Sequence, residues 1–270
     1  MRYAKGAIHL NEAKDIPLLQ QIFQSAYATQ QQLFEFMCLR RCEQSEGALR
    51  TRLSRLVKHD LVKRHTALGL SSSVYSISAT GRDILIYRGE PYAGRGSGLD
   101  RPLATAQHAV DLNGLHLAFL RSGRLREWLP ETEICARNIL TTWGYAKDYD
   151  TVATVADEKG RPITFALEYE RSSKPDAEYQ SIAITLNREA CVDFVLYVTT
   201  TPHLFARVSG ALRQCRQDIL LCFVSELHAR LFDASVTLLS NQWRTTLAQF
   251  INVKHELKAT GSGAKASAAG

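Results

Sequence analysis

Three carboxylates in the middle of the sequence have the spacing of a site that could hold a hard cation. Glu168 and Glu170 lie two residues apart at the end of an apolar run, so they point to the same face of a predicted strand. Asp150 begins the preceding run, and Lys174 follows Glu170. Mg²⁺ prefers oxygen ligands, and a nearby cation can stabilise charge during phosphodiester hydrolysis. Asp150 and Glu168 are therefore candidate metal ligands, and Asp150, Glu168, Glu170 and Lys174 are candidate catalytic residues.

A hairpin must position these side chains. Residues 150–156 alternate like a strand, 157–160 are typical of a turn, and 163–170 run back as a second strand. Further elements are expected in this order: a helix at about 175–190, a strand at 194–198, a helix opening at Thr201-Pro202, a strand at 219–224 and a closing helix pair beyond Val224. This alternation predicts a mixed sheet flanked by helices.

Three helices and two strands are expected in the first ninety residues. Asp15 can cap the first helix, Thr29 and Gln32 form a capping box that opens the second, and the third begins near Ser45. Two strands follow at 61–64 and 74–77, joined by a polar tip at 65–73, and Thr80-Gly81 opens a short helix.

The third helix separates an apolar arc from a basic one. Leu49, Leu53, Leu56 and Val57 share one side of the helical wheel, and the segment 40–64 carries 8 basic and 3 acidic residues. The residues expected to bind duplex DNA are Arg50, Thr51, Ser54, Arg55, Lys58 and Arg64, with Arg50 and Arg55 as the base-edge contacts. The alternative is a solvated helix face in a protein-binding module.

The motifs of this segment resemble the winged helix-turn-helix family over about residues 15–88. The stretch "ALRTRLSRLVKHDLVKR" followed by "VYSISATGRDIL" carries the resemblance. It implies that the third helix enters the major groove and that the strand pair touches the neighbouring DNA backbone.

The hairpin resembles the restriction-endonuclease-like superfamily, whose pattern is an Asp and then a strand carrying an acid, any residue and Lys. Asp150 and Glu168 match the two acids, whereas Glu170 stands where the Lys belongs. Glu131 or Glu133 could supply a further acid. Such departures in the superfamily imply a domain kept for DNA binding or structure. The alternative is a strand end whose acids pair with Arg171, Lys174 or Arg137 at the surface.

The whole arrangement resembles the replication-relaxation family of plasmids and integrative elements over about residues 15–200. "HAVDLNGLHLAF" and "FALEYERSSKPDAEYQ" carry this likeness in the second half. The family implies an accessory DNA-binding role in plasmid replication or mobilisation. Its implied partners are double-stranded DNA and other replication or mobilisation proteins, with a homodimer as an open alternative.

We expect an α+β protein with a winged helix-turn-helix followed by a mixed α/β domain resembling the restriction-endonuclease-like fold. The expected parts are a winged-helix domain at 1–90, a linker at 91–107, a restriction-endonuclease-like domain at 108–258 and a disordered tail at 259–270. Residues 1–90 carry 13 Lys/Arg against 8 Asp/Glu, whereas 128–180 carry 6 against 10. The basic part suits a polyanion, and the acidic part holds the candidate carboxylates.

Composition and cysteine spacing exclude several classes. With 45% hydrophobic and 22% charged residues, the chain is neither disordered nor fibrous. No apolar run approaches the roughly 20 residues that cross a bilayer, and no signal-peptide core follows Met1, so we expect a cytoplasmic protein without a membrane partner. The six cysteines are scattered, and Cys38 and Cys42 lack zinc spacing. No cofactor is expected, except Mg²⁺ if the chain is a nuclease.

Three functions remain open at this point. The first is a DNA-binding accessory protein with an inactive nuclease-like domain, and we expect binding rather than enzymatic activity. The second is a magnesium-dependent DNA nuclease, and the third is a winged-helix transcriptional regulator. The positions of Asp150, Glu168, Glu170 and Lys174 bear on the second, because a metal site requires acid oxygens that converge.

Overall fold

A computed structural model describes residues 8–66 and 72–266 of the chain, with side chains as far as Lys258. The protein is mixed α and β, as expected. It packs as two units, one formed by the chain up to Arg121 together with Pro130–Trp143, the other by Ser122–Leu129 and the chain from Gly144 onward.

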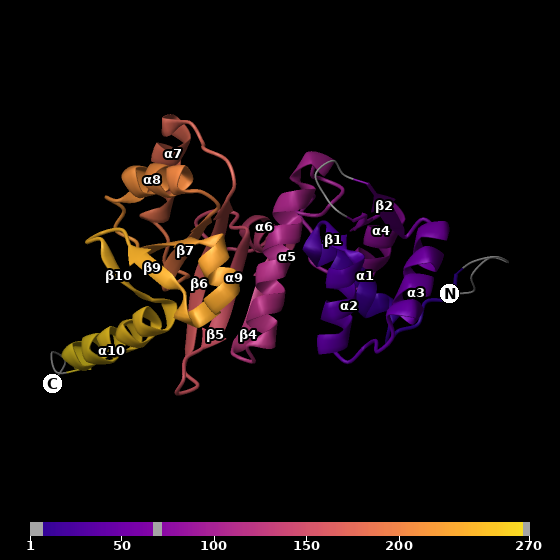
Figure 1. The fold of residues 1–270 in the computed structure, drawn as a ribbon, viewed down its shortest axis with the longest axis horizontal. Helices are drawn as coiled ribbons and strands as arrows, with labels where there is room; N and C mark the ends of the chain where they lie inside the picture. Colours follow the sequence, from indigo (N-terminus) through magenta and orange to yellow (C-terminus); the bar gives the residue numbers. More distant parts are fainter. Residues whose placement is uncertain (1–7, 67–71, 267–270) are drawn as a thin grey trace. The chain divides into compact units, whose positions relative to one another are not determined.

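The first unit combines helices with a small antiparallel sheet (Figure 1). The strand order of this sheet is β1-β3-β2. Its elements are α1 (Asp15–Ser25), β1 (Ala28–Thr29), α2 (Gln30–Leu39), α3 (Glu46–Lys58), β2 (Val62–His65), β3 (Val74–Ile77), α4 (Ala79–Tyr87), the 3₁₀ turn η1 (Leu103–Thr105), α5 (Ala106–Arg121) and α6 (Glu131–Leu140). The three predicted helices and two strands are confirmed. Strand β1 was not predicted, and part of the expected tip at 65–73, residues 67–71, lies outside the described residues.

Side-chain caps explain where α2, α3 and α4 begin. The Thr29 hydroxyl accepts from the Gln32 amide at 3.1 Å, and the Gln32 side chain accepts from the Thr29 amide at 3.1 Å, which confirms the capping box. Ser45 caps α3 as expected. The prediction that Asp15 caps α1 is wrong, because the N-cap is Lys14 without a side-chain cap bond. Helix α4 is capped by Ser78, two residues before the expected start.

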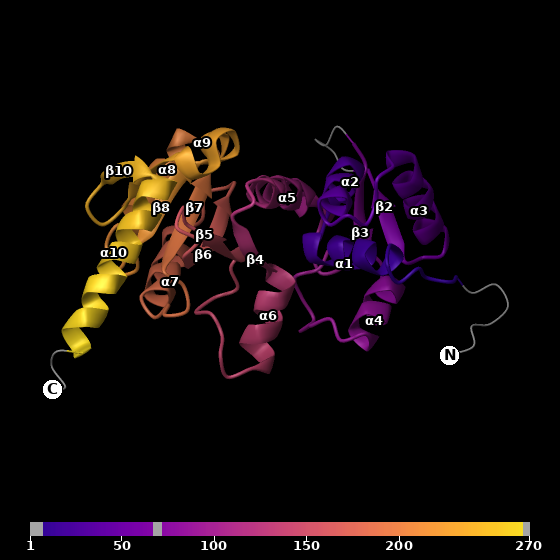
Figure 2. The same cartoon turned by 90° about the horizontal axis from the view of Figure 1, so that it is seen from below.

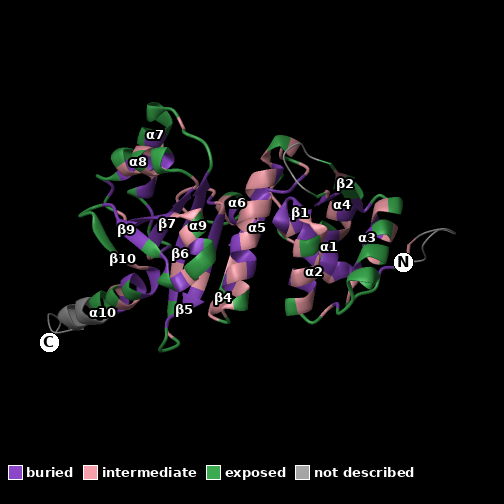
Figure 3. Cartoon of the chain, in the orientation of Figure 1, coloured by how far each residue is buried: buried purple, intermediate pink, exposed green. Residues whose placement is uncertain are grey.

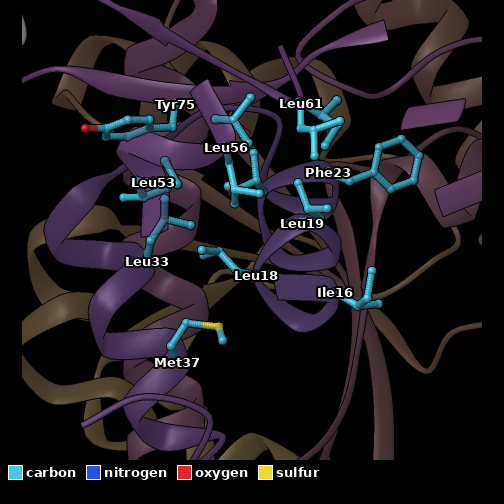
Figure 4. Packing of buried hydrophobic residues seen from close by; sticks show 14 of the residues in the cluster. Ile16, Leu18, Leu19, Phe23, Leu33, Met37, Leu53, Leu56, Leu61 and Tyr75 are labelled. Atoms are coloured by element: carbon cyan, nitrogen blue, oxygen red, sulfur yellow. The ribbon is translucent and has the colours of Figure 1, made fainter. Parts of the chain in front are cut away.

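One hydrophobic core holds α1, α2 and α3 together (Figure 4). Its fully or almost fully buried side chains include Leu18, Leu19, Ile22, Phe23, Leu33, Met37, Leu49, Leu53 and Leu56. Each buried Leu, Ile or Phe contributes about 1.5–3 kcal/mol. Since α3 supplies its apolar arc to this core, its opposite arc is left to solvent, as the exposed residues on α3 in Figure 3 show.

The segment expected to be a linker at 91–107 packs on the first unit. The Tyr27 hydroxyl donates to the carbonyls of Gly98 at 3.0 Å and Arg101 at 2.8 Å. A Cβ at position 98 would lie 2.2 Å from the Ala26 carbonyl oxygen, so only glycine permits this approach. The glycines of this segment serve close packing as well as turns.

Helix α5 overlaps the start of the range expected for the second domain, 108–258, but it belongs to the first unit. The buried Asn113 amide donates to the Tyr27 carbonyl at 2.9 Å, and the Gln32 side chain donates to the Val110 carbonyl at 2.7 Å. The first unit therefore extends beyond the expected boundary at residue 90.

The second unit is built on the expected mixed sheet, with seven strands in the order β10-β9-β8-β7-β6-β5-β4. Its elements are β4 (Leu125–Pro130), β5 (Thr151–Ala156), β6 (Pro162–Glu170), α7 (Asp176–Leu186), β7 (Phe194–Thr199), α8 (Pro202–Leu212), β8 (Ile219–Phe223), α9 (Val224–Arg230), the 3₁₀ turn η2 (Leu231–Asp233), β9 (Ser235–Leu238), β10 (Trp243–Thr246) and α10 (Leu247–Ala266). Strands β5 and β6 form the predicted antiparallel hairpin, and β6, β7 and β8 run parallel (Figure 2).

The end of the chain differs from the prediction of a closing helix pair. Helices α9 and α10 are present, but β9 and β10 lie between them as an antiparallel pair with Trp243 opposite Leu238. The tail expected to be disordered from Ala259 is helical as far as Ala266, and residues 267–270 lie outside the described residues. Within the described part of the chain, none of the helices is both long enough and apolar enough to cross a bilayer.

Candidate functional site

The exposed arc of α3 collects most of the residues predicted to bind DNA. Arg50, Thr51, Ser54 and Lys58 are exposed, while Leu49, Leu53 and Leu56 on the other side are buried. Strand β2 follows α3 directly and exposes Lys63 and Arg64. We call Arg50, Thr51, Ser54, Lys58, Lys63 and Arg64 the basic face.

Arg55, which was predicted to contact a base edge, forms an ion pair and a hydrogen bond within the fold. One guanidinium nitrogen lies 2.5 Å from Asp15 Oδ2, and another donates to the His9 carbonyl at 3.3 Å. The side chain is half-buried, with 40% of its surface exposed. Its charge is engaged within the fold.

Asp15 is the centre of this internal network. Its side chain is fully buried, Oδ1 accepts from Arg52 at 2.6 Å, and Oδ2 also accepts from the Asn11 amide at 2.7 Å. Glu43 binds the other end of the Arg52 guanidinium at 3.4 Å. Burial acts to raise the pKa of Asp15, but the Asn11 amide and the two guanidinium groups outweigh burial and lower it. Asp15 therefore ties α1 to α3 as a buried anion.

In the second unit, the hairpin brings the three predicted acids to one end of the sheet. The pairing of Thr151 with Leu167 places Asp150 beside the end of β6, where Asp150 Oδ2 accepts from the Tyr169 amide at 2.8 Å. Glu168 and Glu170 lie on β6 and are both buried. Asp150 thereby joins the two strands at the open end of the hairpin, where the acids gather.

Two lysines accompany these acids, and only Lys174 was predicted from the sequence. Lys174 pairs with Glu170, as the surface-pairing alternative allowed. The Nζ atom of Lys147 lies 2.8 Å from Glu168 Oε1. Lys147 was not predicted, because the family pattern expects its Lys after Glu168 in the sequence. The indication in the sequence was that Lys147 lies three residues before Asp150. We call Lys147, Asp150, Glu168, Glu170 and Lys174 the lysine-acid cluster.

Burial and charge act in opposite directions within this cluster. Burial, with help from the Asp150 charge, raises the pKa of Glu168 to about 7 despite the adjacent Lys147 ammonium group. For Lys147 the balance is reversed: burial lowers its pKa, but Glu168, Asp150 and Glu170 together raise it. Lys147 therefore stays a cation at neutral pH.

A buried tyrosine borders the cluster from the next strand. Tyr197 of β7 stands opposite Glu168 in the parallel register and is fully buried. Its hydroxyl makes no hydrogen bond to the described residues. Burial and the charges of Glu168 and Glu170 raise the pKa of Tyr197 well above its ordinary value, so the hydroxyl keeps its proton.

The cluster, as it lies, does not fit the ligand set of Mg²⁺. Glu168 and Glu170 each face an ammonium group, and Asp150 accepts from a backbone amide. Across residues 8–66 and 72–258 no group of three or more His, Cys, Asp or Glu side chains could hold a metal ion. The other predicted acids, Glu131 and Glu133, belong to the first unit and pair with Arg101 and Arg137.

Comparison with known proteins gave no match. No family model matches the chain, and neither a curated protein nor a solved structure is similar enough to count as a match. The function is therefore inferred from the basic face and the lysine-acid cluster themselves.

Proposed function

We propose that this chain is a DNA-binding accessory protein in the replication or mobilisation of a plasmid or other mobile element. It binds duplex DNA through the basic face, and its second unit serves assembly or DNA contact without cleavage. The observation that carries this proposal is the exposed arc of α3, which lies opposite the arc buried in the core.

The charge of α3 fits a polyanion. No acidic residue occurs between Gly47 and His59, and the exposed arc presents Arg50 and Lys58 two turns apart. The major groove of B-form DNA is about 12 Å wide and admits an α-helix, so a helix that exposes cations and small hydroxyl groups can contact phosphates and base edges there. Thr51 and Ser54 supply those hydroxyl groups.

Strand β2 extends the cationic surface beyond the helix. Lys63 and Arg64 are both exposed, and the pairing of Arg64 with Tyr75 fixes this strand against β3. In the winged-helix arrangement that the sequence resembles, this strand pair touches the DNA backbone beside the groove. The link to a mobile element is supported by the resemblance of "HAVDLNGLHLAF" and "FALEYERSSKPDAEYQ" to the replication-relaxation family.

Fluorescence anisotropy with labelled duplex DNA tests this function. The double variant Arg50→Ala, Lys58→Ala should bind at least about tenfold more weakly than the wild type, because each contact is worth about 1–3 kcal/mol at a base edge and less at a phosphate. Lys159→Ala removes an exposed cation from the turn between β5 and β6 and should bind like the wild type. Equal affinities for all three proteins would contradict the proposal.

A magnesium-dependent DNA nuclease is the second candidate, favoured by the convergence of Asp150, Glu168 and Glu170 at one end of the hairpin. It ranks second because the glutamates are paired with lysines. A transcriptional regulator would use the same basic face, and selective binding to promoter DNA would distinguish it.

A further inference from the structure

We propose that Lys147 and Lys174 take the place of a divalent metal ion in the lysine-acid cluster, so that this cluster binds no Mg²⁺ and instead fastens two loops to the end of the sheet. The inference goes beyond the proposed function and does not depend on DNA binding.

The five side chains come from three short segments. Lys147 and Asp150 precede β5, Glu168 and Glu170 end β6, and Lys174 lies in the loop that leads to α7. Each lysine therefore joins a loop to β6 through an ion pair, and Asp150 adds its bond to the Tyr169 amide. The loop before β5 and the loop after β6 are thus held at the same place.

The charge balance weakens the attraction of the cluster for a metal ion. Three carboxylates alone would present three negative charges to a cation, but two ammonium groups leave a single net negative charge when all five groups are ionised. Because unit charges a few ångströms apart interact strongly at protein-like permittivity, this difference weakens Mg²⁺ binding greatly.

Burial of the two glutamates makes their lysine partners hard to displace. Glu170 is 3% exposed, and the buried Glu168 Oε1 atom is the one that faces Lys147. Lys147 also lies 5.4 Å from the centre of the Tyr149 ring, which adds a cation–π contact. A metal ion that replaced Lys147 would have to break both contacts and shed its own water.

Binding of Mn²⁺ to the full chain tests the inference, because Mn²⁺ suits carboxylate sites and its free form gives an electron paramagnetic resonance signal. The wild-type protein should not reduce the signal of free Mn²⁺, and adding Mn²⁺ should not raise its melting temperature. The double variant Lys147→Met, Lys174→Met uncovers the acids and should bind Mn²⁺ at least about tenfold more tightly, with a rise in melting temperature.

Two controls assign the gain to the cluster. Adding Glu168→Gln to the double variant should abolish Mn²⁺ binding again. Lys159→Met changes a lysine of the same unit outside the cluster and should behave like the wild type.

Two results would overturn the inference. One is stoichiometric Mn²⁺ binding by the wild type that Glu168→Gln abolishes. The other is a lysine variant that keeps its far-ultraviolet circular dichroism and gains no Mn²⁺ binding. If the double variant does not fold, Lys174→Met alone serves as the uncovered form, because Lys174 is the more exposed of the two lysines at 28%.

Discussion

Arg55 of α3 binds the buried carboxylate of Asp15, forty residues earlier in the chain, at 2.5 Å. Arg52, one turn before it, binds the other oxygen of the same carboxylate at 2.6 Å. The two arginines that flank the basic face therefore hold α3 on α1, while Arg50 and Lys58 are left exposed. One helix thus carries both structural and solvent-facing cations.

Loss of the Asp15 charge should destabilise the first unit. In Asp15→Asn the Arg52 and Arg55 guanidinium groups lose the buried carboxylate between them, although Glu43 still faces Arg52. Removing one partner of a buried ion pair costs about 3 kcal/mol. Urea unfolding measures this loss. Asp83→Asn changes an exposed acid paired with Arg82 and should cost less than about 1 kcal/mol. Similar losses in the two variants would show that the Asp15 network contributes little.

The Asp15 network should also make stability depend on pH. The pKa of Asp15 is lowered in the folded protein. The stability that its ionised carboxylate contributes is therefore fully present above the pKa of Asp15 in the unfolded chain, about 3.8. This stability is lost as the pH falls through the lower pKa that Asp15 has in the folded protein. Between pH 5 and acid pH, the free energy of unfolding should therefore fall more steeply in the wild type than in Asp15→Asn. Parallel curves in urea titrations at a series of pH values would contradict this assignment.

Changing Arg50 to alanine should affect DNA affinity, whereas changing Arg55 to alanine should affect stability. Arg50→Ala should weaken specific DNA binding by about 1–3 kcal/mol with little effect on stability, if Arg50 reaches a base edge. Lys58→Ala should weaken binding to all sequences alike. Arg55→Ala should chiefly lower the free energy of unfolding. The two quantities come from anisotropy and urea titrations, and an Arg55→Ala protein of normal stability that binds as poorly as Arg50→Ala would reverse our assignment.

The predictable parts of the fold were those fixed by neighbours in sequence. The Thr29 capping box and the hairpin β5–β6 depend on residues within one turn or one tight loop, and the apolar arc of α3 follows from its own spacing. The acids of the cluster could be predicted because they lie at one end of that hairpin, Asp150 before β5 and the two glutamates at the end of β6.

The missed features depend on partners far away in the chain. Tyr27 binds the carbonyl of Gly98, 71 residues later, so the glycine-rich segment could not be distinguished from a flexible linker. Strand β10 has a short sequence that is also compatible with a helix, and its pairing with β9 decides the outcome. Lys147 acquires its role only when β5 lies beside β6.

The lysine-acid cluster should not support DNA cleavage. Supercoiled and linear DNA incubated with the wild type and Mg²⁺ or Mn²⁺ should remain intact, because both glutamates are already paired with lysines. Glu170→Lys restores the residue of the nuclease pattern but leaves Lys174 without its acid, and it should also be inactive. Cleavage by the wild type that Asp150→Ala or Glu168→Ala abolishes would make the nuclease the correct function.

The salt dependence of duplex binding tests the central claim most directly. Each phosphate neutralised by a cation releases counterions and contributes about −0.9 to the slope of log affinity against log salt concentration. The wild type should bind duplex DNA with a steep negative slope, and the Arg50→Ala, Lys58→Ala variant should show a slope that is shallower by roughly one to two units if both residues contact phosphates. Absence of duplex binding at low salt, or identical slopes for the two proteins, would contradict the assignment of DNA binding to the basic face.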